Sequence, residues 1–231
     1  IAIGTNTDAY QPLEGEHRIM RGILEVLEAA NHPVAIVTKG ALVTRDADIL
    51  GRMGRRGLAR VALSITTLDH RLSRAMEPRA AAPEVRLRAI AALTRAGCPT
   101  GVMVAPIIPA LTDHEIERIL AAAARAGATV AGWVALRLPR EVSGLFQDWL
   151  AEAYPDRATR IMRLVREMHG GRDYASDWGK RLTGEGVYAR LIARRFEAAR
   201  VREGLAAHGT PLDTSRFRAP ERPGDQLSLG L

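Results

Sequence analysis

Residues 1–12 read IAIGTNTDAYQP, and in this stretch an apolar strand runs into a polar loop, which decides the fold class. The predicted strand, Ile1 to Gly4, is followed by two threonines, an asparagine, an aspartate and a tyrosine within six residues. Folds with parallel strands place their chemistry at the carboxyl ends of those strands. We therefore expect functional side chains directly behind this first strand.

Outward from this stretch, short apolar runs alternate with amphipathic helical patterns. We predict further strands at 34–37, 60–65, 101–105 and 129–136, and helices at 16–30, 46–55, 69–75, 83–96 and 113–126. The strands show no strict alternation, which indicates that both of their faces are covered. Repeated βα units of this kind form a parallel α/β sheet or barrel, and right-handed crossovers bring all five strand ends to one side.

The pattern changes after Pro139. Helices are predicted at 143–153, 156–168 and 184–204, and a proline-rich extended segment begins at Gly209. We therefore divide the chain into a partial (βα) barrel at 1–140, a helical extension at 141–208 and a flexible tail at 209–231. Because the sequence starts inside a strand and without methionine, we expect it to be part of a longer protein.

The composition narrows the functional classes. The 231 residues are 47% hydrophobic, with no run of about 18 apolar residues, so no membrane span is expected. The single cysteine, Cys98, excludes an internal disulfide and fits a reducing, cytoplasmic location. The net charge of +7 comes almost entirely from arginine. That charge has two interpretations: a nucleic-acid surface, or the arginine and alanine bias of a GC-rich genome.

Polar residues follow each predicted strand, and in a barrel they would meet at one mouth. Asp8 offers an anion for an amine, and Lys39, one of only two lysines, offers a cation for a carboxylate. Hydroxyls suited to a ribose follow the third strand, at Ser64, Thr66 and Thr67. Glu77 and Arg79 either pair with each other on the surface or reach over the mouth. Cys98 lies at the opposite end and is interpreted as a small buried residue.

Several of these segments together resemble radical S-adenosylmethionine (SAM) proteins of the spore photoproduct lyase-like group, in an uncharacterised bacterial branch. The matching segments are Gly4 to Pro12, Ile36 to Lys39, Ser64 to Asp69, Glu77 to Ala80, Val104 to Pro109 and Pro211 to Phe217. The resemblance implies a (βα)₆ barrel of which five strands are present here. It also implies a missing first strand followed by a Cys-x-x-x-Cys-x-x-Cys loop that holds a 4Fe–4S cluster.

The resemblance also implies an activity: one electron from a flavodoxin or ferredoxin cleaves SAM at the cluster and leaves a 5′-deoxyadenosyl radical. By position, Thr7 and Asp8 would lie by the methionine amine, and Lys39 by its carboxylate. Ser64 would lie near the amine or ribose, with Thr66 among the ribose hydroxyls. Pro106 to Pro109 and the strand at Trp133 to Leu136 would flank the adenine. No metal ligand is expected within this chain.

Two departures from the family pattern matter. The three cluster cysteines are absent, so this chain alone should not assemble the cluster. The photoproduct lyases also carry a cysteine hydrogen donor in the segment that aligns with Thr5 to Asp8, where this chain has none. That second difference argues against thymine-dimer repair by the same mechanism, and the substrate stays open.

The last residues carry a separate signal. The sequence from Asp225 to Leu231 resembles the short motif by which bacterial replication and repair proteins bind the DNA sliding clamp. In that interpretation an apolar groove receives leucines while an amide sets the register, through Gln226, Leu227, Leu229 and Leu231. The alternative to an enzyme is then a non-catalytic scaffold recruited to DNA by its tail. A third possibility is an aldolase-like barrel with Lys39 as Schiff-base nucleophile.

Overall fold

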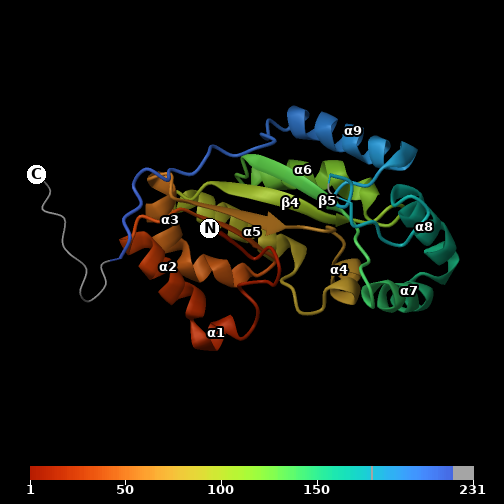
Figure 1. Cartoon of the computed structure of the whole chain (residues 1–231), viewed down its shortest axis with the longest axis horizontal. Coiled ribbons are helices and arrows are strands. Elements are labelled where there is room, and N and C mark those ends of the chain that lie inside the picture. Colours follow the sequence, from red (N-terminus) through yellow and green to blue (C-terminus); the bar gives the residue numbers. More distant parts are fainter. Residues whose placement is uncertain (178, 221–231) are drawn as a thin grey trace, which may run out of the picture.

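The computed structural model describes residues 1–177 and 179–220, and these form one parallel sheet with helices packed on it (Figure 1). The sheet order is β1-β2-β3-β4-β5, so strands that follow each other in sequence are neighbours in space. The strands are β1 (Ala2–Ile3), β2 (Val34–Thr38), β3 (Ala59–Ser64), β4 (Thr100–Ile107) and β5 (Val130–Ala135). The predicted α/β fold class, a partial parallel (βα) barrel, is confirmed.

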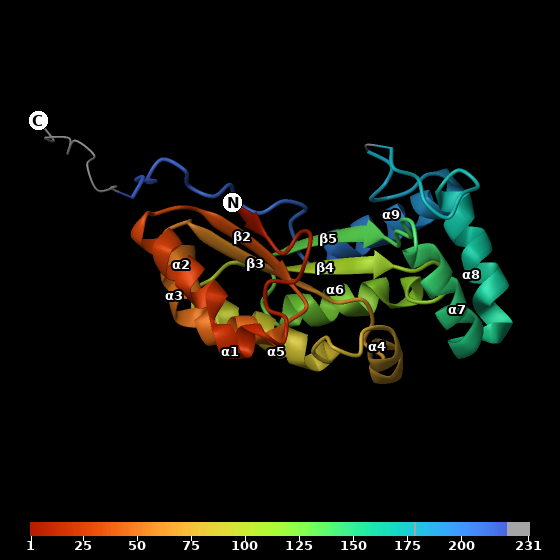
Figure 2. The same cartoon turned by 60° about the horizontal axis from the view of Figure 1, so that its bottom comes forward.

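The register is parallel throughout. Ala2 pairs with Ala35, Val34 with Ala59, and Gly101 with Val130. All five strands therefore end at the same side of the molecule, which in Figure 2 is the side where α4 and α7 lie. The far edge of β5 is covered by the segment after the last helix, because the Ala131 amide donates to the Ala206 carbonyl at 3.0 Å.

The crossover helices gather on one side of the sheet (Figure 2). They are α1 (Glu14–His17), α2 (Ile19–Ala29), α3 (Ala47–Arg55), α4 (His70–Met76), α5 (Pro83–Arg95) and α6 (Ile116–Arg125), with 3₁₀ turns at Ala41–Asp46 and Asp113–Glu115. The main core lies between these helices and the sheet and is built from residues such as Leu24, Ile36, Leu63, Ile90 and Ile119. Burial of these aliphatic side chains is the dominant favourable term for this layer.

Three helices follow the sheet: α7 (Val142–Ala153), α8 (Pro155–Met168) and α9 (Gly186–Arg202). A second apolar cluster joins α4 to α7 and α8 beside the strand ends, and includes Leu72, Leu111, Leu138, Leu150 and Ile161. Helix α9 instead packs into the main core through Ile192 and Phe196. The division of the chain at residues 140 and 208 stays a prediction.

The predicted helix at 16–30 differs in one detail. Arg18 adopts a left-handed conformation, with φ of 51°, and separates α1 from α2. The reason lies in the buried carboxylate of Glu14. It accepts a hydrogen bond from the Met20 amide at 2.9 Å and forms an ion pair with Arg45 at 2.7 Å. This side chain satisfies an amide of the first turn of α2, so the chain can restart the helix there.

Candidate functional site

The loop after β1 brings the first predicted site residue against the end of β2. The turn requires Gly4, whose φ is 87° and where an added Cβ atom would lie 1.9 Å from the Val37 carbonyl oxygen. The Asp8 carboxylate then accepts the Tyr10 amide at 2.9 Å, the Thr38 hydroxyl, and the Lys39 amide at 2.7 Å. Asp8 thus ties two strand ends together.

Lys39 is the first residue after β2, and its side chain turns toward the connection that follows β3. The ammonium forms an ion pair with Glu77 Oε1, while 32% of the lysine side chain stays exposed. An ammonium group has three donors, so the contact with Glu77 leaves capacity for a second acceptor.

Glu77 is the centre of the arrangement. Its second carboxylate oxygen accepts the Arg86 guanidinium at 2.8 Å, and Arg86 also donates to the Ser64 carbonyl at 2.8 Å. Burial by itself would raise the pKa of Glu77, but the Lys39 and Arg86 cations and their hydrogen bonds outweigh it, so the pKa lies below its usual value. Glu77 is therefore a carboxylate with only 11% of its side chain exposed that stays charged near neutral pH.

The third and fourth strand ends join the same cluster. The Thr66 hydroxyl lies 3.1 Å from Glu77 Oε1 and 3.0 Å from the Ala105 carbonyl, which directly precedes Pro106. Ser64 is buried at the end of β3, and Arg86 holds its carbonyl. Neighbouring Thr67 turns away to the buried Glu115, to which its hydroxyl donates. Thr7 is exposed on the loop beside Asp8.

Four strand ends are thus linked by direct contacts. Asp8, Lys39, Thr66 and the Ala105–Pro106 bond surround Glu77 or its partners. A cavity of about 360 Å³ borders Glu77 and is lined by α4 residues including His70 and Arg74. The opportunities for binding are an unfilled donor capacity on Lys39 and one unused lone pair on Asp8 Oδ2.

The sequence left the place of Glu77 open and missed Arg86. Of the two arrangements expected for Glu77 and Arg79, a surface pair or a position over the mouth, Glu77 joins the cluster and pairs with Lys39 and Arg86, whereas Arg79 is exposed. Arg86 is 1% exposed. Arginines are almost never fully buried unless they are paired, and Arg86 is paired with Glu77. The burial of Arg86 could have been predicted from the sequence. Arg86 precedes Ala89, Ile90 and Leu93 at helical spacing, which places it on the apolar face of α5.

Metal ligands do not gather in the described part of the chain. Residues 1–177 and 179–220 contain no group of three or more histidine, cysteine, aspartate or glutamate side chains that could hold a metal ion. Cys98 is buried, as expected, and burial raises the pKa of its thiol to about 12. Across the same residues, no helix combines the length and the apolar character that crossing a bilayer requires.

The comparisons with known proteins agree with this geometry. The model of the radical SAM superfamily matches residues 1–123, which is more than half of the chain. The chain belongs to the radical SAM superfamily. Uncharacterised proteins of Mycobacterium bovis and Mycobacterium tuberculosis are 38% identical over 168 residues, which is 72% of this chain and 49% of theirs. The chain thus spans about half the length of these curated relatives.

An uncharacterised protein of Methanocaldococcus jannaschii is 30% identical over 115 residues, or 50% of this chain and 43% of that protein. Among solved structures, a point mutant of spore photoproduct lyase matches with a TM-score of 0.57 at 19% identity, covering 84% of this chain and 57% of that one. A double mutant with bound AdoMet and dinucleoside spore photoproduct matches with a TM-score of 0.53 at 18% identity, covering 87% and 59%. At these identities the likeness establishes a shared fold.

The radical SAM family implies SAM and a 4Fe–4S cluster, and the residues present fit the first but not the second. The unused acceptor on Asp8 and the unused donors on Lys39 suit an amine beside a carboxylate. The cluster would need three thiolates, whereas the chain has one cysteine, which is buried and follows α5 at the amino end of β4. No step that uses a cluster can therefore be assigned to these residues.

The predicted clamp motif, at Gln226, Leu227, Leu229 and Leu231, lies outside the described residues. It stays a prediction, as does the scaffold role that depends on it.

Proposed function

We propose that the full-length protein is a radical SAM enzyme in which the strand ends of this chain bind the methionine and ribose parts of SAM. The observation that carries the proposal is the convergence of Lys39 and Thr66 on Glu77 at the carboxyl end of a parallel sheet, with Asp8 bound to the backbone amide of Lys39. The superfamily match over residues 1–123 supports the choice of ligand.

The roles of the side chains follow from their remaining hydrogen-bonding capacity. Asp8 uses three of about four acceptor positions within the protein, which leaves one for the methionine ammonium of SAM. Lys39 keeps donors for the methionine carboxylate while Glu77 holds its side chain in place. Thr7, Ser64 and Thr66 lie at the same end for contacts to the ribose and the amine, and Pro106 offers an apolar surface to the adenine.

Reductive cleavage of SAM belongs to the longer protein in this proposal. It needs cluster ligands that this chain does not contain, so the chain alone is expected to be inactive. A flavodoxin or ferredoxin is the proposed electron donor, and a nucleic-acid substrate fits the net charge of +7. Lyase-like chemistry is proposed from the fold shared with spore photoproduct lyase.

The geometry favours this function over an aldolase with Lys39 as nucleophile. Schiff-base lysines are activated by desolvation or by a neighbouring cation. Lys39 instead contacts a carboxylate and stays one-third exposed. The arrangement therefore suits an ammonium that binds an anion.

The test is anaerobic reconstitution of the full-length protein, followed by measurement of SAM binding and of 5′-deoxyadenosine. We expect Asp8→Asn and Lys39→Met to weaken SAM binding by about tenfold or more, because each loses a charge-assisted hydrogen bond. Lys180→Met is the matched control, since it removes the other lysine, which pairs with Glu185 on the surface. Equal SAM affinities for Lys39→Met, Lys180→Met and wild type would contradict the proposed site.

A further inference from the structure

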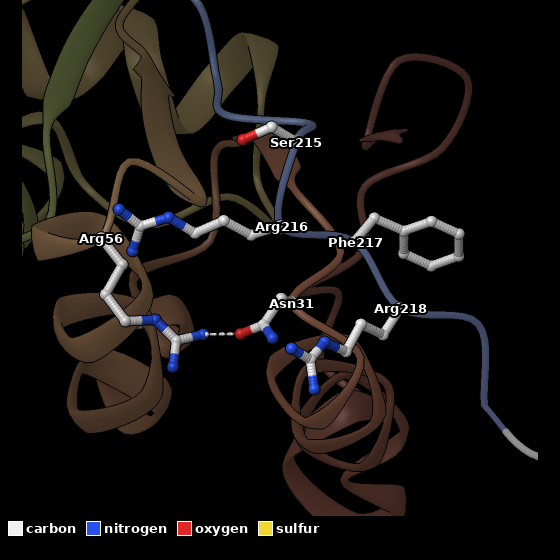
Figure 3. A pocket seen from close by; sticks show the side chains of 6 residues that line it. All are labelled: Asn31, Arg56, Ser215, Arg216, Phe217 and Arg218. Atoms are coloured by element: carbon white, nitrogen blue, oxygen red, sulfur yellow. Dashed lines mark hydrogen bonds between the residues drawn. The ribbon is translucent and has the colours of Figure 1, made fainter. Parts of the chain in front are cut away.

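A second polar cavity lies at the amino end of the sheet, opposite the strand ends described above. It has a volume of about 430 Å³ and is lined by Asn31, Arg56, Ser215, Arg216, Phe217 and Arg218 (Figure 3). Asn31 precedes β2 and Arg56 follows α3, while the other four residues belong to the segment after α9. The cavity thus joins parts of the chain that are about 160 to 190 residues apart.

Cations outnumber anions around this cavity. Arg56, Arg216 and Arg218 all border it, and Figure 3 shows their side chains around one space with Asn31 between them. Asp213 is the carboxylate in contact with them, at 2.9 Å from Arg216 Nε. Arg56 also acts on Glu28 through its charge, but Arg52 already holds that carboxylate through two bonds at 2.9 and 2.8 Å.

The guanidinium groups keep unused donors. Arg56 gives one terminal nitrogen to the Asn31 side chain at 2.7 Å, but its Nε is buried without a partner in the described part of the chain. Across residues 1–177 and 179–220, no acceptor contacts the Arg218 side chain, and Arg216 is held only through Nε. A buried donor without an acceptor costs free energy, and a bound anion would recover it.

The wall of the cavity is held in place before any ligand binds. The segment at 213–218 is fixed at both ends, because the Asp213 amide donates to the Gly57 carbonyl and the Arg218 amide to the Ala30 carbonyl, each at 2.9 Å. Asp213 also accepts the Ser215 amide and hydroxyl, and Phe217 packs edge-on against His32 with ring centroids 5.1 Å apart. Fixing a binding segment in advance lowers the entropic cost of binding.

We propose that this cavity binds a phosphoryl group, and this inference does not depend on the function proposed for the strand ends. Planar guanidinium groups match the paired oxygens of a phosphate, and a net excess of two positive charges suits a dianion. The volume exceeds that of inorganic phosphate alone and falls in the range of small-ligand sites. The phosphoryl group can come from a free phosphate compound or from a nucleic-acid backbone, which share this chemistry.

The test is calorimetric titration of the full-length protein with inorganic phosphate at low ionic strength. Wild type should bind saturably, and Arg218→Gln should weaken binding by about tenfold or more, through loss of one charged partner. Arg218 has no side-chain partner to lose among the residues that the structure describes, so the variant should fold normally, and Arg56→Gln provides a second variant within the same cavity. Arg163→Gln is the matched control because that arginine is exposed on α8, away from the cavity.

A second arm separates the two sources of the phosphoryl group. A labelled oligothymidylate of about ten nucleotides is titrated against the same variants. If Arg218→Gln weakens its binding and phosphate competes with it, the source is a nucleic-acid backbone. If only the binding of inorganic phosphate depends on Arg218, the source is a small phosphorylated compound. Absence of saturable phosphate binding to wild type, or equal affinities for wild type, Arg218→Gln and Arg56→Gln, would overturn the proposal.

Discussion

The two ends of the sheet handle charge in opposite ways. At the carboxyl end, Glu77 lies between Lys39 and Arg86, so each cation faces a carboxylate. At the amino end, Arg56 and Arg218 border an open cavity, and no carboxylate within residues 1–177 and 179–220 forms a salt bridge with either side chain. Both ends use arginine. Arg86 at the carboxyl end is fully buried and paired, whereas the Arg218 side chain at the amino end has no partner among the described residues.

This difference separates structural from binding arginines. Arg86 satisfies the Ser64 and Ala81 carbonyls as well as Glu77, so its removal leaves acceptors buried and unpaired. Within the described part of the chain, Arg218 contributes its backbone amide to the fold, as donor to the Ala30 carbonyl. Breaking a buried pair is expensive, whereas an exposed, unpaired cation contributes little to stability.

The largest effect is expected at Arg86. Arg86→Leu should lower the free energy of unfolding by about 3–5 kcal/mol, because it leaves the buried Glu77 carboxylate with one cation fewer. Urea denaturation measures the change. Arg88→Leu, on the exposed face of the same helix, should change stability by no more than about 0.5 kcal/mol. Similar losses for both variants would mean that Arg86 is not the structural partner of Glu77.

The next effect is a change in pH dependence. The pKa of Glu77 lies below 4.5 in the folded protein, so its stabilisation is complete above that pH and is lost as the pH falls through the lower, folded-state value. Glu77→Gln removes this contribution, so the stability difference between wild type and variant should shrink on acidification below about pH 4.5. Unfolding curves from about pH 7 to pH 3 measure it. Glu152→Gln, at an exposed site on α7, should run parallel to wild type, and a parallel Glu77→Gln curve would exclude this linkage.

A smaller effect is expected at the amino end. Phe217→Ala should cost about 1 kcal/mol or less, because Phe217 is 45% exposed and loses one edge-on contact with His32. Hydrogen exchange of the Asp213 and Arg218 amides, whose bonds hold the 213–218 segment, should speed up. Leu145→Ala, an exposed site on α7 at the other end, should leave both amides unchanged. Unchanged exchange in Phe217→Ala would show that the segment does not depend on the aromatic contact.

The smallest effect is expected at Arg218. Arg218→Gln should shift the free energy of unfolding by less than about 0.5 kcal/mol, and so should the control, Arg163→Gln. Thermal and urea denaturation measure both. A loss comparable to that of Arg86→Leu would make Arg218 a structural residue and remove the contrast between the two ends.

The comparison also explains which parts of the site could be predicted. Ser64 is the last residue of β3, and Asp8, Lys39 and Thr66 follow their strands directly or in the next loop, so strand periodicity alone placed them at one end. For Glu77, the sequence left open a surface pair with Arg79 or a position over the mouth, and the structure pairs it with Lys39 and Arg86. Arg86 was missed as a partner, although its spacing places it on the apolar face of α5.

The cavity at the amino end could not be predicted in this way. The segment from Pro211 to Phe217 matched the family pattern, but nothing in its composition indicated that it returns to the starts of β2 and β3. The bonds that hold it there run from Asp213 to Gly57 and from Arg218 to Ala30. Contacts between residues so far apart depend on the whole path of the chain and leave no local pattern.

By itself, the sequence determined the five parallel strands, their common carboxyl end and the polar residues that follow them, because the periodicity and glycine stops that specify βα units are local. Only the tertiary structure decided which charges meet. A side chain reaches its partner across the sheet or from a returning segment, and the low polarity of the interior makes the difference between a paired and an unpaired charge large. Arg86 and Arg218 are the same residue type, but their surroundings differ. Arg86 is buried against Glu77 and stabilises the fold, whereas Arg218 borders a cavity where we propose that it binds a ligand.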